Sequence, residues 1–330
     1  MNEITGNIVA FTDFEEKVDE LQKEYLAFLN SLDHSLSEVG ISQFNERTEK
    51  REGTPCIAFY TPFWFADVLN VEDPEAVRQI AEGNIYLYHF VTLKDDASDQ
   101  QRSNANKYLA LSDKLLKKAL DNFSPFINEQ SLKYTFSRYN HEWNQAEEYL
   151  RRHQGQMIPY NDKDFEMMGK KASMIKMCLP VLIAIADKQN NNQIEKATDN
   201  AATGLQFMDD LIDWREDNKA ELNTYPLWLV KTPSQKGIPS INESEIRENI
   251  YLGGIVEDVL NKSNHYLTIS KDLFNSTARY WPNFLDSTIQ LNSSVIKIIE
   301  SEKKGIEDKK PTQGYLDNLE TTVRIYMQQT

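Results

Sequence analysis

The chain has 330 residues, of which 40% are hydrophobic and 11% aromatic, enough apolar side chain for a large core. Its formal net charge of −15 disfavours non-specific binding to nucleic acid or to an anionic membrane surface. The longest apolar stretch, residues 177–186, is too short to span a bilayer. No basic segment followed by an apolar run opens the sequence, and Cys56 and Cys178 have no metal-ligand spacing. We therefore expect a soluble, cytoplasmic protein with two buried thiols.

Apolar residues recur at three- and four-residue steps along the first half of the chain, which predicts amphipathic helices. The polar stretch 43–53 predicts a loop, and Pro62 is expected to begin a helix in the most aromatic stretch of the chain. Asp73 and Pro74 are typical of a helix start. The helices predicted in this half cover residues 14–36, a segment from Pro62, 74–99, about 104–120 and about 129–152.

The second half continues the helical pattern. Residues 155–161 form a break, and 162–187 predict a central buried helix. A polar turn at 189–193 precedes a second long helix, which leads to the acidic residues 209–217. Residues 225–230 predict a short element, and residues 231–242 predict a loop that could act as a flap. Helices then fill 243–279, 283–301 and 314–327. Because we find no strand alternation, internal repeat or linker, the sequence predicts an all-α fold in a single domain, 1–330, of long antiparallel helices.

An acidic run stands where the second long helix loses its apolar stripe. Asp209, Asp213 and Asp217 are spaced four residues apart, so their carboxylates share one helix face, with Asp210 beside them. Like charges at this spacing repel each other. A solvated acidic face is the alternative for this stretch alone, but a bound cation would relieve the repulsion.

A second run has the same spacing. Asp95, Asp96 and Asp99 stand 114 residues earlier (209 − 95), again where the apolar face of a predicted helix runs out. One such cluster is common in an acidic chain, whereas two at matching spacing favour a metal site.

Paired Asp-Asp-x-x-Asp runs resemble the two aspartate-rich motifs of the class I isoprenoid synthases, which comprise terpene cyclases, trans-prenyl-diphosphate synthases and squalene/phytoene synthases. Residues 74–99 resemble the first motif helix and 204–217 the second. Gln206 with Asp209–Asp213 is most similar to the prenyl-synthase form, and Trp214–Asp217 to the squalene/phytoene branch. The resemblance implies a helical bundle around a central active-site cavity and a prenyl diphosphate substrate. It also makes a homodimer plausible.

The resemblance further implies Mg²⁺, three ions per diphosphate, because this hard cation joins carboxylates to substrate phosphates. By resemblance, Asp95 and Asp99 hold one part of the metal cluster, and Asp209 and Asp213 the other, with Asp210 and Asp217 in support. Asp96 completes the catalytic set of Asp95, Asp96, Asp99, Asp209 and Asp213.

Basic and aromatic residues should complete the site. The candidates for diphosphate binding are Arg102, Lys170, Lys171, Arg279 and Tyr280, each of which could equally be an ordinary surface residue. Aromatic rings can stabilise a carbocation through cation–π attraction without attacking it. Candidates for that apolar pocket, which could equally be ordinary core, are Phe59, Phe63, Trp64, Tyr88 and Phe207.

Departures from the family patterns guide the choice of reaction. The N-terminal region lacks the basic Gly-Lys-x-x-Arg segment with which elongating prenyl synthases bind isopentenyl diphosphate. The second motif also lacks the Asn/Ser/Glu triad of typical terpene cyclases. The leading hypothesis is an atypical Mg²⁺-dependent terpene cyclase that ionises a linear all-trans prenyl diphosphate and releases a hydrocarbon or alcohol. The alternatives are a prenyltransferase that joins two prenyl units, and a non-catalytic partner subunit of a synthase.

Overall fold

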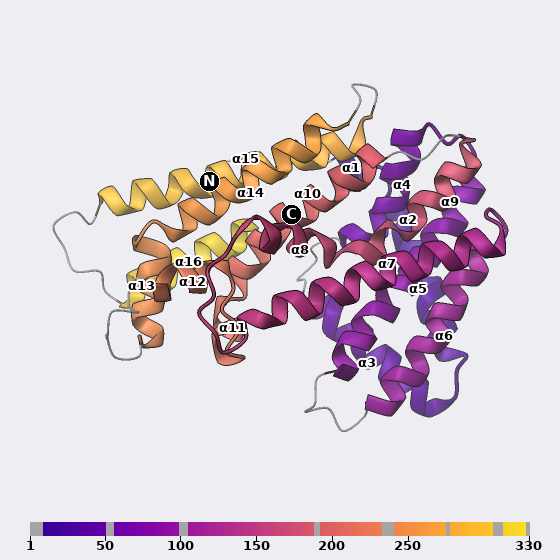
Figure 1. The fold of residues 1–330 in the computed structure, drawn as a ribbon, viewed down its shortest axis with the longest axis horizontal. Coiled ribbons are helices and arrows are strands. Elements are labelled where there is room, and N and C mark those ends of the chain that lie inside the picture. Colours follow the sequence, from indigo (N-terminus) through magenta and orange to yellow (C-terminus); the bar gives the residue numbers. More distant parts are fainter. Residues whose placement is uncertain are drawn as a thin grey trace. The chain divides into compact units, whose positions relative to one another are not determined.

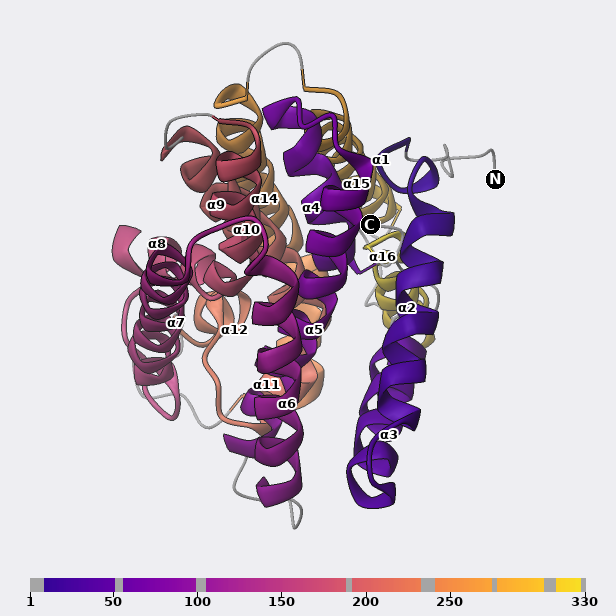
Figure 2. The ribbon, with the colours of Figure 1, turned by 90° about the vertical axis from the view of Figure 1, so that its right-hand side faces the viewer.

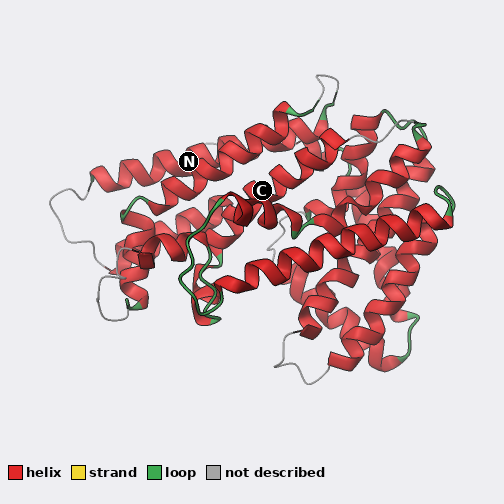
Figure 3. Ribbon diagram, viewed as in Figure 1, coloured by secondary structure: helices red, strands yellow, loops and turns green. Residues whose placement is uncertain are grey.

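The computed structural model describes residues 9–50, 56–98, 105–187, 192–232, 241–274, 278–305 and 313–327. Within these ranges the chain forms helices and connecting turns and no strand, apart from an isolated bridge between Gln154 and Leu222 (Figure 3). This confirms the all-α prediction. No helix of the same ranges is long and apolar enough to cross a membrane. Cys56 and Cys178 are both buried and unbonded to each other, as expected.

The chain divides into two compact units. Unit 1 comprises Met1–His141, Ser173–Asn192 and Asn275–Phe284, and unit 2 comprises Glu142–Ala172, Gln193–Phe274 and Leu285–Thr330. Helices α7 (Glu129–Leu150) and α15 (Tyr280–Lys304) contribute residues to both. The single-domain arrangement around a cavity stays a prediction.

Unit 1 is built around α5 (Pro74–Ser98), which packs side by side with α6 (Ala105–Phe123) (Figures 1 and 2). Its buried positions, among them Val77, Ala81 and Ile85, recur at helical spacing, and Asp73 caps its start by accepting from the Ala76 amide. The other elements of this unit are α1 (Val9–Thr12), α2 (Glu15–Asn30), α3 (His34–Lys50), α4 (Ile57–Leu69), α6 (Ala105–Phe123), η2 (Ser173–Met177) and α9 (Cys178–Ile185).

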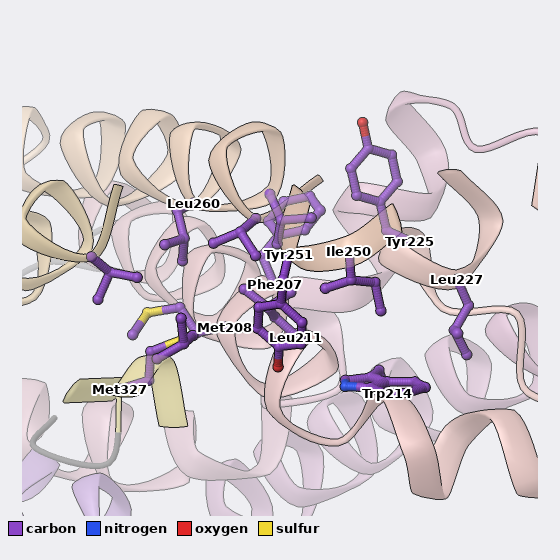
Figure 4. Close-up of a cluster of buried hydrophobic side chains, with 14 of the residues drawn as sticks. Phe207, Met208, Leu211, Trp214, Tyr225, Leu227, Ile250, Tyr251, Leu260 and Met327 are labelled. Carbon is purple, nitrogen blue, oxygen red and sulfur yellow. The ribbon is translucent and has the colours of Figure 1, made fainter. Parts of the chain in front are cut away.

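Unit 2 contains α10 (Asn192–Ile212), the helix that carries the second acidic run. Apolar side chains of α10 and the start of α11 (Trp214–Lys219) pack against α13 (Glu243–Leu252) and α16 (Gln313–Met327) in a buried cluster. The cluster includes Phe207, Leu211, Trp214, Tyr251 and Met327 (Figure 4). The remaining elements are η1 (Arg151–His153), α8 (Asp162–Lys170), α11 (Trp214–Lys219), α12 (Tyr225–Lys231), α13 (Glu243–Leu252), α14 (Ile255–Asp272) and α16 (Gln313–Met327).

Three predicted elements of the N-terminal region, where α2, α3 and α4 lie, were wrong in part. The helix expected over 14–36 ends at Asn30, because Asp33 caps a new helix: its Oδ1 accepts from the Leu36 amide over 3.2 Å. That new helix, α3, covers most of the stretch predicted as a loop. Helix α4 begins at Ile57, so Pro62 lies inside it rather than at its start.

The helix expected over 162–187 is divided into α8, η2 and α9. The Ala172 amide bonds to the Gly169 carbonyl, three residues back, which ends α8. The predicted turn at 189–193 and the predicted flap at 231–242 lie largely outside the described residues.

Candidate functional site

The second acidic run spans the junction between two helices of unit 2. Helix α10 ends at Ile212 and α11 begins at Trp214, so Asp213 stands between them. Helical hydrogen bonds nevertheless continue across the break: the Asp213 amide donates to the Asp209 carbonyl over 2.9 Å, and the Asp217 amide to the Asp213 carbonyl over 3.0 Å. The predicted one-turn spacing of the three carboxylates is therefore retained.

The four carboxylates of this run differ in exposure. Asp209 and Asp213 are exposed, Asp217 is half-buried and Asp210 is buried. Gln206 lies one turn earlier, and its Nε2 donates to Asp210 Oδ1 over 2.7 Å and to Asp209 Oδ2 over 3.2 Å. One amide thus orients the first two carboxylates of the run.

Two carboxyl groups of this run have raised pKa values, because they are buried or half-buried and lie close to other negative charges. Burial raises the pKa of Asp210 to about 8. The hydrogen bond from Gln206 lowers this pKa, whereas the negative charges of Asp217 and Asp209 raise it further. Burial likewise raises the pKa of Asp217 to about 7; a hydrogen bond with Thr224 opposes this, and repulsion from Asp213 and Asp209 reinforces it. A divalent cation would offset both effects.

The donor set suits Mg²⁺, which prefers carboxylate oxygens. Among the described residues no three His, Cys, Asp or Glu side chains are gathered tightly enough to enclose an ion by themselves. Mg²⁺ does not need such a cage, because it usually takes one or two carboxylates and completes its shell with water and substrate phosphates. The exposed Asp209 and Asp213 fit that requirement.

Of the two candidate lysines, Lys171 acts on the acidic run. Its charge lowers the pKa of both Asp210 and Asp217, although its Nζ also lies 3.5 Å from Glu147 Oε1. Lys170 instead pairs with Glu166 over 2.7 Å. Lys171, immediately after α8, is therefore a cation of unit 2 that acts on these carboxylates.

A buried polar network beside the run was not predicted. Asp164 is fully buried and accepts from Arg152 over 2.5 Å, with His153 Nε2 at 2.6 Å. The ring of Tyr160 stacks on His153, with 4.2 Å between ring centroids. Burial, together with the charges of Asp210, Asp164 and Asp217, raises the pKa of Tyr160. The charges of the acidic run therefore act on Tyr160, a member of this network.

Asn223 ties the same network to the chain that follows the run. Its Nδ2 donates to the carbonyls of His153 and Gln156 over 3.2 and 3.0 Å, and its Oδ1 accepts from Lys231 Nζ over 2.8 Å. The Tyr160 hydroxyl donates to the Asn223 carbonyl over 3.1 Å. The only sequence signal nearby is the capping box between Asn161 and Asp164, which predicts a helix start and none of these contacts.

In unit 1, the first acidic run ends α5. Asp95 is exposed, whereas Asp96 is buried and its Oδ1 lies 3.1 Å from the guanidinium of Arg47 on α3. Asp99 and Arg102 lie outside the described residues. Asp95 and Asp96 thus have different surroundings despite being neighbours.

Arg279 and Tyr280 lie at the opposite end of unit 1 from Asp95. Both backbone amides donate to Asp67, over 2.6 and 3.3 Å, and both side chains contact Asp13. Asp67 stands near the end of α4, shortly before α5 begins at Pro74, and Asp95 comes 21 residues later (95 − 74). Along a helix that is about 30 Å. We therefore leave this pair out of the proposed diphosphate site.

Solved structures share this arrangement of helices. A decaprenyl diphosphate synthase from Rhodobacter capsulatus matches with a TM-score of 0.66 at 12% identity, over 85% of this chain and 98% of that one. A geranylgeranyl pyrophosphate synthetase from the archaeon Geoglobus acetivorans matches at 0.65 and 16%, over 84% and 99%. A polyprenyl synthase from Caulobacter crescentus, complexed with calcium and isoprenyl diphosphate, matches at 0.60 and 14%, over 87% and 97%.

The chain has the fold of the class I isoprenoid synthases. No protein-family model and no curated protein sequence matches it. In this isoprenoid-synthase fold, each unit carries one acidic run at the C-terminal end of a long helix, α5 in unit 1 and α10 in unit 2.

The five predicted pocket residues have different places in the isoprenoid-synthase fold. Phe59 and Tyr88 meet edge to face, with ring centroids 5.3 Å apart, and so connect α4 to the second half of α5. Phe63 stacks on Phe14. Trp64 is fully buried and donates to the Ala10 carbonyl. Phe207 belongs to the apolar core of unit 2 (Figure 4). The Phe59–Tyr88 pair leads along α5 towards the first acidic run, and Phe207 lies on α10 two residues before Asp209 but is buried in the core.

Proposed function

We propose that this chain is a Mg²⁺-dependent prenyltransferase, the alternative that the sequence left open beside a terpene cyclase. The observation that carries the proposal is the run of four carboxylates from the end of α10 into α11, with Lys171 beside it, in a fold that the chain shares with prenyl diphosphate synthases. The Caulobacter crescentus structure, which binds calcium and isoprenyl diphosphate, supports a divalent metal and a diphosphate ligand.

The reaction would break the allylic C–O bond of one prenyl diphosphate, with the electron pair leaving on pyrophosphate. A C–C bond to the alkene of a second prenyl unit would then form, followed by loss of a proton. Mg²⁺, when bound, would neutralise the charge that develops on the leaving group. We keep three ions per diphosphate as a prediction.

The residues would divide this work. Asp209 and Asp213, with Asp217 in support, would hold metal in unit 2, and Asp95 with Asp99 in unit 1. Gln206 would orient Asp209 through its hydrogen bond, and Asp210 would stay in support because it is buried. Lys171 would add positive charge for the diphosphate. Phe59 and Tyr88 would offer aromatic faces to the carbocation.

The test is a product assay. The purified protein is incubated with C10, C15, C20 or C25 all-trans prenyl diphosphates, each alone and with isopentenyl diphosphate, in Mg²⁺ or in EDTA. We expect pyrophosphate release and a longer prenyl chain in Mg²⁺ only, and loss of both in Asp95→Ala and Asp209→Ala. Asp286→Ala is the control, because Asp286 is a partly exposed carboxylate paired with Lys271.

Three outcomes would contradict the proposal. A hydrocarbon or alcohol made from one substrate would return the assignment to a terpene cyclase. Pyrophosphate release that survives EDTA would exclude the metal-dependent mechanism. A folded protein that releases no pyrophosphate from any substrate would support the non-catalytic partner subunit. A homodimer and a cytoplasmic location remain part of the prediction.

A further inference from the structure

Two polar side chains of α3 reach α5 shortly before its acidic end. Gln43, only 1% exposed, donates from Nε2 to Thr92 Oγ1 over 2.8 Å, and its Oε1 lies 3.2 Å from His89 Nδ1. His89 is equally buried and stacks on Tyr25 of α2. This amide bonds a buried imidazole and a partly buried hydroxyl at once, so it tolerates little displacement of either helix.

Arg47 repeats the connection one turn further along. Its guanidinium lies 3.1 Å from Asp96 Oδ1, and Asp96 is 8% exposed. Both contacts join residues separated by the same 49 positions, 43 with 92 and 47 with 96. The two pairs therefore stand one helical turn apart on α3 and on α5, and a slip of α5 by one residue or one turn breaks both.

We infer that Gln43 and Arg47 are positioning residues for the first acidic run. Apolar contacts between helices allow small sliding movements, whereas directional polar pairs such as these partly buried ones have one good geometry and favour one register. By holding Thr92 and Asp96, the two α3 residues fix the height and rotation of the last turn of α5. Asp95 then projects from α5 in one defined direction. This inference rests on the proposed function, in which Asp95 holds metal.

Helix α5 offers a matched control. Arg78 forms an ion pair with Glu24 of α2, so it also joins α5 to an N-terminal helix through a guanidinium and a carboxylate. This pair lies near the start of α5, and both side chains are more than one-third exposed. Removing it tests the loss of an α5 ion pair without disturbing the acidic end.

The experiment compares Arg47→Ala, Gln43→Leu, Arg47→Lys and Arg78→Ala with the wild type in two measurements. The first is amide hydrogen exchange in α5. The second is the kcat and KM of Mg²⁺-dependent pyrophosphate release from a prenyl diphosphate. We expect Arg47→Ala and Gln43→Leu to exchange at least about tenfold faster over residues 89–98 and to lower kcat by about 10- to 100-fold with a smaller change in KM. Arg47→Lys should recover part of both, and Arg78→Ala should change neither.

A double variant tests whether Arg47 acts through Asp96. Adding Asp96→Asn to Arg47→Ala should cause little further loss of kcat, because the contact is already absent. Exchange over residues 89–98 that is the same in Arg47→Ala as in Arg78→Ala would overturn the inference. If Arg47→Ala does not fold, Arg47→Lys decides: unchanged exchange and unchanged kcat would overturn it. If the wild type releases no pyrophosphate, that result contradicts the proposed function. Hydrogen exchange in the variants then still tests whether Gln43 and Arg47 hold the end of α5 in place.

Discussion

Gln206 donates to the buried carboxylate of Asp210 over 2.7 Å, yet the pKa of Asp210 remains raised to about 8. One hydrogen bond therefore does not compensate for burial and for the neighbouring charges of Asp217 and Asp209. In the metal-free protein this carboxyl holds a proton at pH values where an ordinary aspartate, near 3.8, has lost it.

The stability of the metal-free protein should fall as pH rises. Between about pH 4 and 8 the folded state binds more protons than the unfolded state, because the pKa values of Asp210 and Asp217 are raised on folding. We expect the free energy of unfolding in EDTA to decrease from pH 5 to pH 8. Asp210→Asn should be more stable than wild type at pH 8, by at least about 1 kcal/mol, and should depend less on pH.

Urea denaturation in EDTA at several pH values measures this effect. Asp286→Asn serves as the control, since that carboxylate is paired with Lys271 and half-exposed. Parallel pH profiles for the wild type and Asp210→Asn would show that Asp210 is not protonated in the folded protein.

Metal and diphosphate should reverse this loss of stability. At pH 8, Mg²⁺ with inorganic pyrophosphate at about one hundred times its dissociation constant should add about 2.7 kcal/mol to the free energy of unfolding. The effect should shrink in Asp209→Asn, Asp213→Asn and Lys171→Met, and it should weaken towards pH 6, where protons compete with the metal. Thermal denaturation with and without ligand measures it. An equal gain in Asp209→Asn and Asp286→Asn would place the ion elsewhere.

How far the sequence predicts these features depends on their range along the chain. Helix α5 was predicted almost to its ends, because Asp73, Pro74 and a long apolar stripe are local signals. The spacing of Asp209, Asp213 and Asp217 was likewise visible, since it follows from helix geometry alone.

Contacts between distant segments carried no such signal. The pairing of Arg47 with Asp96 joins two helices, but the polar composition of residues 43–53 around Arg47 predicts a loop. The stacking of Tyr160 on His153 depends on how residues 151–161 fold back beside the acidic run. Asp33 did carry a local signal, a capping aspartate, but the continuing apolar pattern concealed the break after α2.

Asp164 should be important for the stability of unit 2. Burial alone would raise its pKa, but hydrogen bonds from Arg152, His153 and the Asn161 amide outweigh burial and lower it. Asp164→Asn would leave the half-buried Arg152 and the buried His153 without their anionic partner, and we expect a loss of about 3 kcal/mol at pH 7. Urea denaturation measures the loss. Asp162→Asn, an exposed change in the same first turn, should cost less than about 1 kcal/mol. Equal losses in both variants would contradict a buried charged network.

Gly169 allows α8 to approach α10 closely. A Cβ at this position would overlap the Asp199 carbonyl oxygen and lie 2.6 Å from Thr203 Oγ1. That hydroxyl already joins the two helices, because it lies 3.0 Å from the Phe165 carbonyl of α8. We expect Gly169→Ala to destabilise the protein by about 1–3 kcal/mol, since backbone must move to admit the methyl group. Gly314→Ala is the matched control: nothing lies within 4 Å of a Cβ there. This second alanine should be neutral or stabilising by up to about 1 kcal/mol, because alanine favours a helix over glycine. Urea denaturation of both variants measures the difference, and equal stability of the two would contradict the close approach of α8 and α10.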